Sequence, residues 1–97
     1  MTKIDNNRLN LKINKSLTEE FIEPLKKELV EIDFTQKKFS SIAIDISDVV
    51  EIDFFGFQMI ALFYSYLVDT LLYQKENIVL KKSETFKKLE EKMRIII

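Results

Sequence analysis

Apolar and polar residues alternate near the start of the chain in the pattern typical of a half-buried strand. Leu9, Leu11 and Ile13 occupy every second position, with polar residues between them. Residues 2–4 form a shorter strand candidate just before this segment. Residues 5–7, Asp-Asn-Asn, suit the turn between the two, because Asn and Asp tolerate the left-handed backbone conformation. The chain is therefore expected to begin with a β-hairpin.

Apolar residues at helical spacing follow the hairpin. They are Phe21, Leu25, Leu29 and Ile32. Residues 16–19, Ser-Leu-Thr-Glu, offer a capping box at the start of this segment. Proline is tolerated in a first helical turn but breaks a helix interior, so Pro24 predicts that the regular helix begins near residues 22–24.

Two further strands and two further helices complete the pattern. Residues 41–47 form the clearest strand, with three isoleucines on one face, and residues 78–80 form a short buried one. A helix is predicted over residues 55–73, and residues 83–85, Ser-Glu-Thr, can start another. The apolar stripe of that last helix consists of Phe86, Leu89 and Met93. The isoleucines at residues 95–97 are expected to pack back on the body, because an exposed apolar terminus favours aggregation.

The predicted elements follow the order β-β-α-β-α-β-α. No linker rich in Pro, Gly or Ser divides the 97 residues, which include one Gly and one Pro. We therefore expect a single domain over residues 1–97. A hairpin followed by strand–helix–strand connections predicts the α/β class, with a mixed sheet of about four strands covered by three or more helices.

Composition narrows the chemistry that this domain can perform. The chain has no His and no Cys, which removes the commonest metal ligand, the thiol nucleophile and the side chain best suited to acid–base work near neutral pH. Its 15 Lys and Arg against 16 Asp and Glu give a net charge of -1, without the excess of cations typical of a nucleic-acid binder. We expect no catalytic residues, no metal, no cofactor and no nucleic-acid partner.

The most apolar stretch of the chain covers residues 54–68. It is preceded by Asp53 and contains Gln58 and Ser65. A membrane span needs about 20 apolar residues, so this shorter stretch predicts a core helix instead. Residues 1–7 have no apolar core of the signal-peptide type. The sequence therefore predicts a cytoplasmic protein without direct membrane insertion.

A motif in the middle of the chain resembles a known family. Residues 45–57 have the sequence Asp-Ile-Ser-Asp-Val-Val-Glu-Ile-Asp-Phe-Phe-Gly-Phe. This resembles the central motif of STAS domains, the fold shared by anti-sigma-factor antagonists and the cytoplasmic tails of sulfate transporters. The family pattern is a strand ending in Asp-Leu-Ser-Gly, a loop, and Ile-Asp-Ser-Ser/Thr-Gly-Leu at a helix start. The order of elements matches along essentially the whole chain. The resemblance implies a bacterial domain that works in signal transduction by binding other proteins.

The chain departs from the family at the usual phosphorylation site. In regulatory STAS proteins a partner kinase phosphorylates the hydroxyl residue just before the motif Gly. A phosphate there gains from free N–H groups at the helix start and adds charge to a docking surface. In this chain the position is Phe55, preceded by Phe54. The resemblance therefore implies that the phosphoswitch is lost at its usual place, and neither Ser47 nor Ser65 occupies that position.

Two other motif residues match the family directly. Asp53 precedes the predicted helix start, so it is expected to cap the helix through backbone N–H groups, with direct contact to a partner as the alternative. Gly56 is expected to allow close packing of the helix start on the loop. Asp48 stands where the family has Gly, which predicts a different turn after the strand.

The aromatic segment around this motif is the candidate docking surface. A helical rotation places on the sheet side Met59, Ile60, Phe63, Tyr66 and Leu67. The opposite face is nearly free of charge and comprises Gln58, Ala61, Ser65, Val68 and Leu72. A helix that is apolar almost all round is buried on both sides or meets a partner. The candidate partner-binding residues are Asp53, Phe54, Phe55, Gly56, Phe57, Gln58, Ala61 and Ser65. For Phe54 and Phe55, an inward position as core residues is the alternative.

Two functions stay open at this point. The first is a non-catalytic regulatory module, like an anti-sigma-factor antagonist or a chemotaxis-cluster STAS protein. Such a module docks a kinase, an anti-sigma factor or a chemotaxis component without the usual phosphoswitch. The second is a small cytosolic STAS subunit of a phospholipid-trafficking ABC transporter that binds the ATPase. Whether the domain also forms a homodimer through its aromatic helix is left open by the sequence.

Overall fold

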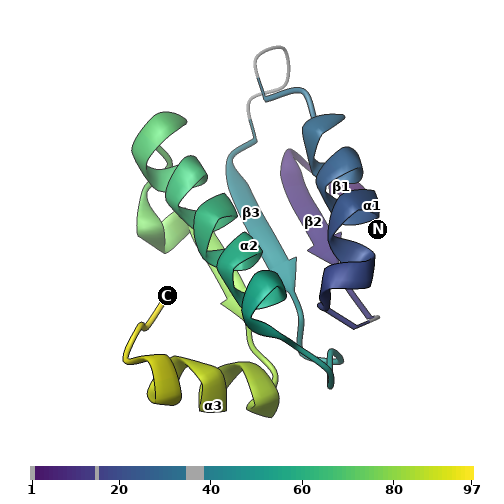
Figure 1. Ribbon diagram of the computed structural model, residues 1–97. Coiled ribbons are helices and arrows are strands. Elements are labelled where there is room, and N and C mark those ends of the chain that lie inside the picture. Colours follow the sequence, from purple (N-terminus) through teal and green to yellow (C-terminus); the bar gives the residue numbers. More distant parts are fainter. Residues whose placement is uncertain (1, 15, 35–38) are drawn as a thin grey trace.

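The computed structural model describes residues 2–14, 16–34 and 39–97. Its elements are β1 (Thr2–Asp5), β2 (Arg8–Lys12), α1 (Glu19–Val30), β3 (Ser41–Asp45), α2 (Phe54–Ser65), the π-helical turn η1 (Tyr66–Thr70), the 3-10 turn η2 (Lys75–Asn77), β4 (Ile78–Lys81) and α3 (Glu84–Met93). The strands form one mixed sheet in the order β1-β2-β3-β4 (Figure 1). The predicted α/β class and the predicted order of strands and α-helices are confirmed.

The N-terminal hairpin forms as its sequence predicts. Strands β1 and β2 are antiparallel, with Ile4 opposite Leu9. Asn6 and Asn7 have φ angles of 50° and 65°. A two-residue hairpin turn whose twist matches that of its strands needs positive φ at both central residues, and Asn adopts this conformation more readily than most residues. Local turn chemistry therefore sets the register of the first two strands.

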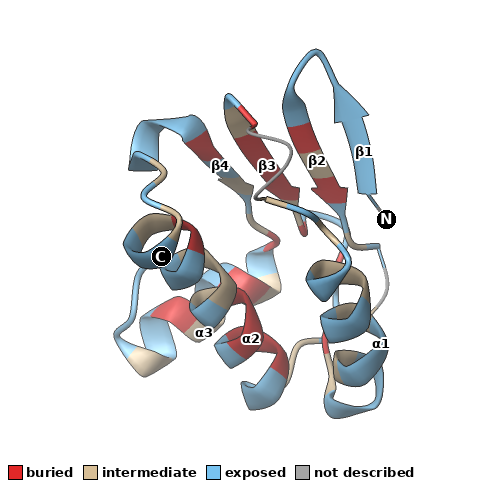
Figure 2. Cartoon of the chain, turned by 90° about the horizontal axis from the view of Figure 1, so that it is seen from above, coloured by how far each residue is buried: buried red, intermediate tan, exposed pale blue. Residues whose placement is uncertain are grey.

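The sheet packs one of its faces on the helices. Strands β2, β3 and β4 run parallel to one another. All three α-helices lie on the same side of the sheet (Figure 2). Leu9, Ile42 and Ile44 are buried beneath them, whereas Arg8 and Lys12 alternate with the buried positions of β2 and are exposed. The period of two along β2 and β4 thus separates the core from the solvent, whereas the central residues of β3 are buried on both faces.

Helix α1 begins earlier than Pro24 predicts. It starts at Glu19 and includes Pro24, so the expected start near residues 22–24 is wrong. The predicted capping box does not form either, because the N-cap residue is Thr18 and its side chain makes no capping hydrogen bond. Instead, the backbone N–H of Glu19 donates a hydrogen bond of 2.8 Å to Oδ2 of Asp53. This cap from a distant residue stabilises the turn ahead of the proline.

Helix α2 lies beside α1 on the sheet and continues directly into η1 (Figure 1). The helical chain ends before Leu72, whose φ of 61° is incompatible with a further helical turn. Of the residues predicted on the sheet side, Met59, Ile60 and Leu67 are buried, whereas Tyr66, where η1 begins, is exposed. No helix within the described ranges has the length and hydropathy needed to span a bilayer.

Helix α3 closes one end of the core. It starts within the predicted segment 83–85. Its N-cap is Ser83, and Oγ of Ser83 accepts a hydrogen bond of 3.2 Å from the backbone N–H of Phe86. Phe86 is fully buried and stacks on Phe57 of α2, with ring centroids 4.9 Å apart. This aromatic contact joins the last two helices of the chain.

A buried carboxylate fixes the end of the chain. Oε2 of Glu90 accepts hydrogen bonds from Nζ of Lys82 at 2.9 Å and from the backbone N–H of Ile97 at 2.8 Å. Ile97 packs against the core, whereas Ile95 and Ile96 remain exposed. The expected packing of the three terminal isoleucines therefore holds for Ile97 alone.

Candidate protein-docking site

One carboxylate caps two helices at the centre of the site. Oδ1 of Asp53 accepts a hydrogen bond of 2.9 Å from the backbone N–H of Gly56 in the first turn of α2. Oδ2 of the same side chain accepts the bond from Glu19 at the start of α1. Each helix N-terminus presents unpaired N–H groups and a partial positive charge, so a single anion suits both. Asp53 is thus a cap, and it holds the starts of α1 and α2 together.

These hydrogen bonds lower the pKa of the Asp53 carboxyl below its ordinary value of 3.8. The largest cause is the backbone N–H of Gly56, which favours the charged form, and the N–H of Glu19 acts in the same direction. Partial desolvation opposes them. Both carboxylate oxygens are engaged, so Asp53 is not arranged as a general base.

The loops before α1 and α2 are joined by a short parallel bridge between Leu17 and Ile52. The backbone N–H of Leu17 donates to the carbonyl of Glu51 at 2.7 Å, and that of Asp53 donates to the carbonyl of Leu17 at 3.1 Å. The first turn of α2 presses on this bridge. A Cβ atom built on Gly56 would lie 1.9 Å from the carbonyl oxygen of Leu17. The motif glycine therefore permits close packing, as expected from the sequence.

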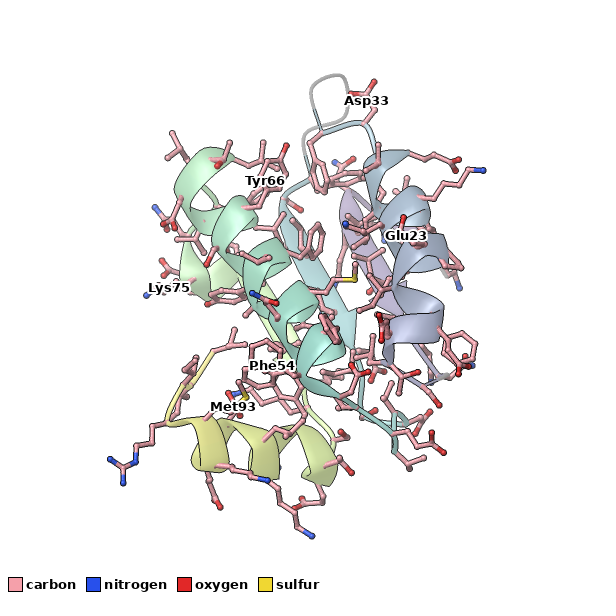
Figure 3. The ribbon with its side chains drawn as sticks, in the orientation of Figure 1. Glu23, Asp33, Phe54, Tyr66, Lys75 and Met93 are labelled. Atoms are coloured by element: carbon pink, nitrogen blue, oxygen red, sulfur yellow. The ribbon has the colours of Figure 1, made fainter. Side chains whose placement is uncertain are left out.

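Two phenylalanines project from this rigidly held helix start. Phe54 is 55% exposed and Phe55 is 50% exposed, so both are partly in solvent. Their rings meet edge to face, with centroids 6.1 Å apart. Figure 3 shows Phe54 at the start of α2, in the region above α3. The alternative of an inward, core position does not describe either residue.

The other candidate residues divide by their position around α2. Gln58 and Ser65 are exposed, and Ala61 is half-buried, so all three belong to the outward side. Gly56 and Phe57 are buried, and Phe57 is only 1% exposed. A partner cannot reach Phe57 without disturbing the core, so we remove Gly56 and Phe57 from the docking surface. The remaining surface is centred on Phe54, Phe55 and Gln58.

Two exposed apolar residues near the site were not singled out from the sequence. Leu62 of α2 and Val30 of α1 are 63% and 83% exposed. Both line a groove between the two helices, and Phe55 lies in its wall. One pattern in the sequence could have indicated Leu62, because it lies seven residues, or one heptad, after Phe55. It held none for Val30, because the contact between α1 and α2 is tertiary.

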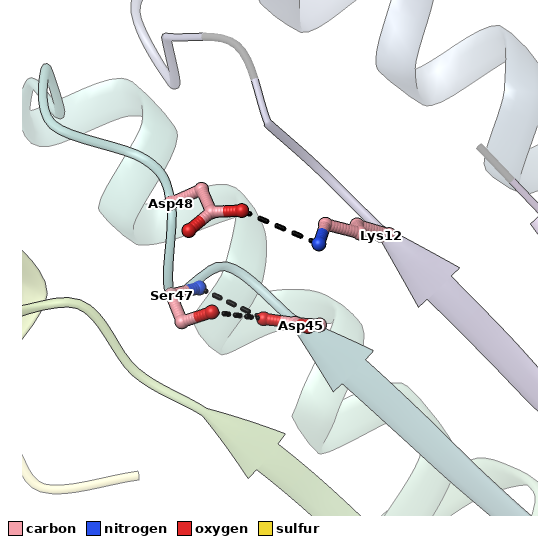
Figure 4. A network of polar contacts seen from close by, with 4 residues as sticks. All are labelled: Lys12, Asp45, Ser47 and Asp48. Atoms are coloured by element: carbon pink, nitrogen blue, oxygen red, sulfur yellow. Dashed lines mark hydrogen bonds and ion pairs between the residues drawn. The ribbon is translucent and has the colours of Figure 1, made fainter.

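Ser47, which follows β3, lies close to two carboxylates. The hydroxyl and the backbone N–H of Ser47 both donate to Oδ1 of Asp45 (Figure 4). The hydroxyl of Ser47 is the main cause of the lowered pKa of the Asp45 carboxyl. The neighbouring Asp48 pairs with Lys12 at 3.3 Å, between side chains that are both well exposed. A phosphate on Ser47 would meet two negative charges, so this environment is unfavourable for a relocated phosphoswitch.

Metal chemistry has no support in the described part of the chain. Within residues 2–14, 16–34 and 39–97, no group of three or more His, Cys, Asp or Glu side chains is placed to hold a metal ion.

The arrangement at the start of α2 offers apolar rings, an amide and backbone held in place by a double cap. Such a surface is suited to binding another protein.

Comparison with known proteins gives no relative. No family model matches the chain, and searches of curated proteins and of solved structures find no significant match. The resemblance to STAS domains therefore depends on the motif at residues 45–57 and on the order of elements.

Proposed function

We propose that this protein is a non-catalytic, STAS-like interaction module that docks a regulatory protein through the start of α2. The observation that supports this proposal is the half-exposed Phe54–Phe55 pair at a helix start fixed by the double cap of Asp53. Aromatic residues supply large contact areas at low cost in conformational entropy, and they are enriched among residues that dominate binding energy. A helix start that is already ordered binds without the entropic cost of folding a loop.

Docking at this surface is proposed to be independent of phosphorylation. The residue that precedes the motif glycine is Phe55, which has no hydroxyl to modify. Phosphate recovered from residues 47–65 after incubation with a cognate kinase would contradict this part of the proposal. The resemblance to short STAS proteins points to a kinase, an anti-sigma factor or a chemotaxis component as the partner.

The test is affinity purification of the tagged protein from its source cells, followed by binding measurements with the recovered partner. Replacing Phe54 by Ala is expected to weaken binding about 10-fold or more, because truncating a central aromatic contact typically costs over 1 kcal/mol. The matched control is Val50→Ala, which truncates a 74% exposed apolar residue in the loop before α2. Equal binding of the partner by both variants would contradict the proposed docking site.

The identity of the partner tests the regulatory role separately. A histidine kinase, an anti-sigma factor or a receptor-cluster component would support signalling. Recovery of an ABC ATPase bound through Phe54 would instead assign the module to a transporter, while leaving the docking surface intact.

A further inference from the structure

Strand β1 forms one edge of the sheet (Figure 2). Among the strands of the described residues it pairs with β2 alone, and all four of its residues are exposed. The outer side of an edge strand presents a row of backbone N–H and C=O groups, which can pair with another extended chain. The edge of β1 is therefore a candidate surface for strand addition.

The pairing of β2 shows which backbone groups of β1 point outward. The N–H of Ile13, directly after β2, donates to the carbonyl of Asp45 in β3 at 2.9 Å. Alternate residues of a strand turn their backbone groups to opposite neighbours, so the odd-numbered residues of β2 face β3 and the even-numbered ones face β1. Two of these even-numbered residues are paired with Lys3 and Asp5. The backbone N–H and C=O of Ile4, between these two, therefore point away from β2.

The side chains of β1 divide between the two faces of the sheet. Ile4 lies opposite Leu9 on the face that the helices cover, and it is 47% exposed. Its neighbours Lys3 and Asp5 belong to the other face, because successive side chains of a strand alternate. A lysine on an edge strand normally opposes pairing with another strand. Here an opposite charge follows it on the same face of the same strand.

Antiparallel pairing of β1 with its own copy matches charges in a single register. When Ile4 lies opposite Ile4 of the second copy, Lys3 of each copy lies opposite Asp5 of the other. The outward backbone groups of the two Ile4 residues can then exchange a pair of hydrogen bonds. The next register in either direction that keeps these backbone bonds sets Lys3 against Lys3 or Asp5 against Asp5, and like charges directly opposite each other are destabilising. The strand is thus complementary to a second copy of itself.

We propose that two copies of this chain pair antiparallel through β1, about a two-fold axis at Ile4, so that their sheets become one continuous sheet. A two-fold contact of this kind closes after two copies. The dimer goes beyond the proposed docking function and does not depend on it. Helix α1 lies on the β1 side of the sheet and α2 lies further from that edge (Figures 1 and 2), so the dimer and the docking surface share no residue.

The dimer is expected to be weak. Strand β1 has four residues, so the paired region is short. Glu28 and Glu31 of α1 line the hollow beside Ile4, and a two-fold axis there brings acidic groups of both copies towards one another. We therefore expect a dissociation constant on the order of 0.1 mM, which is typical of a small, transient interface.

Sedimentation of the full chain from about 10 µM to about 1 mM tests the proposal. The wild type is expected to approach twice the 11.5 kDa of one chain, which is 23 kDa. Lys3→Asp is expected to weaken dimerisation about 10-fold or more, because two attractive pairs become two repulsive ones. The matched control, Lys75→Asp, makes the same charge reversal at an exposed residue of η2 and should dimerise like the wild type.

Charge exchange between two variants tests the register itself. Lys3→Asp leaves two acidic residues on β1, and Asp5→Lys leaves two basic ones. Each variant alone is expected to stay largely monomeric at concentrations where the wild type dimerises. An equimolar mixture of the two restores opposite charges at both positions and should associate at least as strongly as the wild type. A mixture that associates no better than either variant alone would exclude this register.

A cysteine design avoids any change of charge. The chain has no cysteine, so one introduced thiol reports on self-contact without competition. Directly opposite residues of an antiparallel pair lie within the Cα separation that a disulfide needs. Under mild oxidation Ile4→Cys is expected to form a disulfide-linked dimer, whereas Val79→Cys, on the other edge strand and 40% exposed, is not. A wild type that stays monomeric throughout the series, or equal cross-linking of the two cysteine variants, would overturn the dimer. Neither result bears on partner binding through Phe54.

Discussion

Helices α2 and α3 meet through the stacked rings of Phe57 and Phe86, yet their outer sides differ completely. The outer side of α3 is formed by charged residues: Lys87, Lys88, Glu91 and Lys92. The outer side of α2 is formed by uncharged residues, among them Phe54, Phe55, Gln58 and Leu62. Both helices bury one face on the same core, so the core does not explain the difference. The two helices differ only in the side chains that they expose to the solvent.

This difference is the reason why we place the proposed docking surface on α2 and not on α3. An outer face of charged residues keeps a helix soluble and gives little binding energy, because exposed ion pairs contribute about 0–1 kcal/mol. An outer face with half-exposed phenylalanines costs solubility unless another surface covers it. Helix α3 therefore serves the fold, and α2 serves both the fold and, in our proposal, binding. The predictions below separate these two contributions.

The largest expected effect comes from the contact that the two helices share. Phe57→Ala removes a buried ring from between α2 and α3 and leaves a cavity, which should lower the free energy of unfolding by about 4 kcal/mol. Urea unfolding followed by circular dichroism measures this change. If the variant does not fold, Phe57→Leu is expected to lose only about 1.5 kcal/mol. Losses below 1 kcal/mol for both variants would show that the stack contributes little.

The next effect is at the contact between α2 and the loop before α1. Gly56→Ala places a methyl group against the backbone carbonyl of Leu17, which cannot rotate away. Overpacking against a backbone atom should cost about 3 kcal/mol, although Ala is the better helix former. The control on the same helix is Gln58→Ala, an exposed substitution expected to stay within about 0.5 kcal/mol. A stabilised Gly56→Ala variant would contradict the close packing.

The double cap of Asp53 predicts that the free energy of unfolding depends on pH. The cap of α3 adds no such dependence, because it is the hydroxyl of Ser83. Because the pKa of Asp53 is lower in the folded chain, its stabilisation is fully present above the unfolded pKa, near 3.8. It is lost as the pH falls through the lowered folded pKa. Asp53→Asn offers one acceptor oxygen in place of two, so it can cap only one of the two helices.

Urea unfolding at neutral pH and again below the folded pKa of Asp53 measures this effect. Asp53→Asn should be less stable than the wild type at neutral pH, and the difference should shrink in acid. Asp48→Asn is the matched control, because its carboxylate makes a well-exposed ion pair with Lys12. A difference between wild type and Asp53→Asn that is independent of pH would exclude the carboxylate as the source.

Local patterns predicted much of the fold. The hairpin followed from strict alternation and from Asn6 and Asn7, and the start of α3 followed from Ser83, because each depends on neighbouring residues. The start of α1 was wrong because its cap, Asp53, lies 34 residues further along the chain. By itself Pro24 disfavours a helix interior, yet it lies inside α1, whose first turn is capped by the hydrogen bond from Glu19 to Asp53.

The site was harder to predict than the fold. The motif located Asp53 and Gly56 and assigned each a structural role, because a helix start has known requirements. Three phenylalanines in four positions, however, look equivalent in the sequence. Only the packing of α2 against the sheet and α3 decides that Phe57 is core and that Phe54 is not. The groove residue Val30 depends on how α1 sits beside α2, which no local pattern contains.

The smallest expected effect on stability therefore completes the comparison with Phe57. Phe54→Ala removes the same side chain three residues earlier on the same helix, where it is 55% exposed. Its free energy of unfolding should stay within about 0.5 kcal/mol of the wild type, because little buried area is lost and the caps of Asp53 use backbone N–H groups. Urea unfolding beside Phe57→Ala measures the contrast. A loss approaching that of Phe57→Ala would make Phe54 a core residue and remove the basis for docking, whereas unchanged stability with weakened partner binding would assign the exposed ring to recognition.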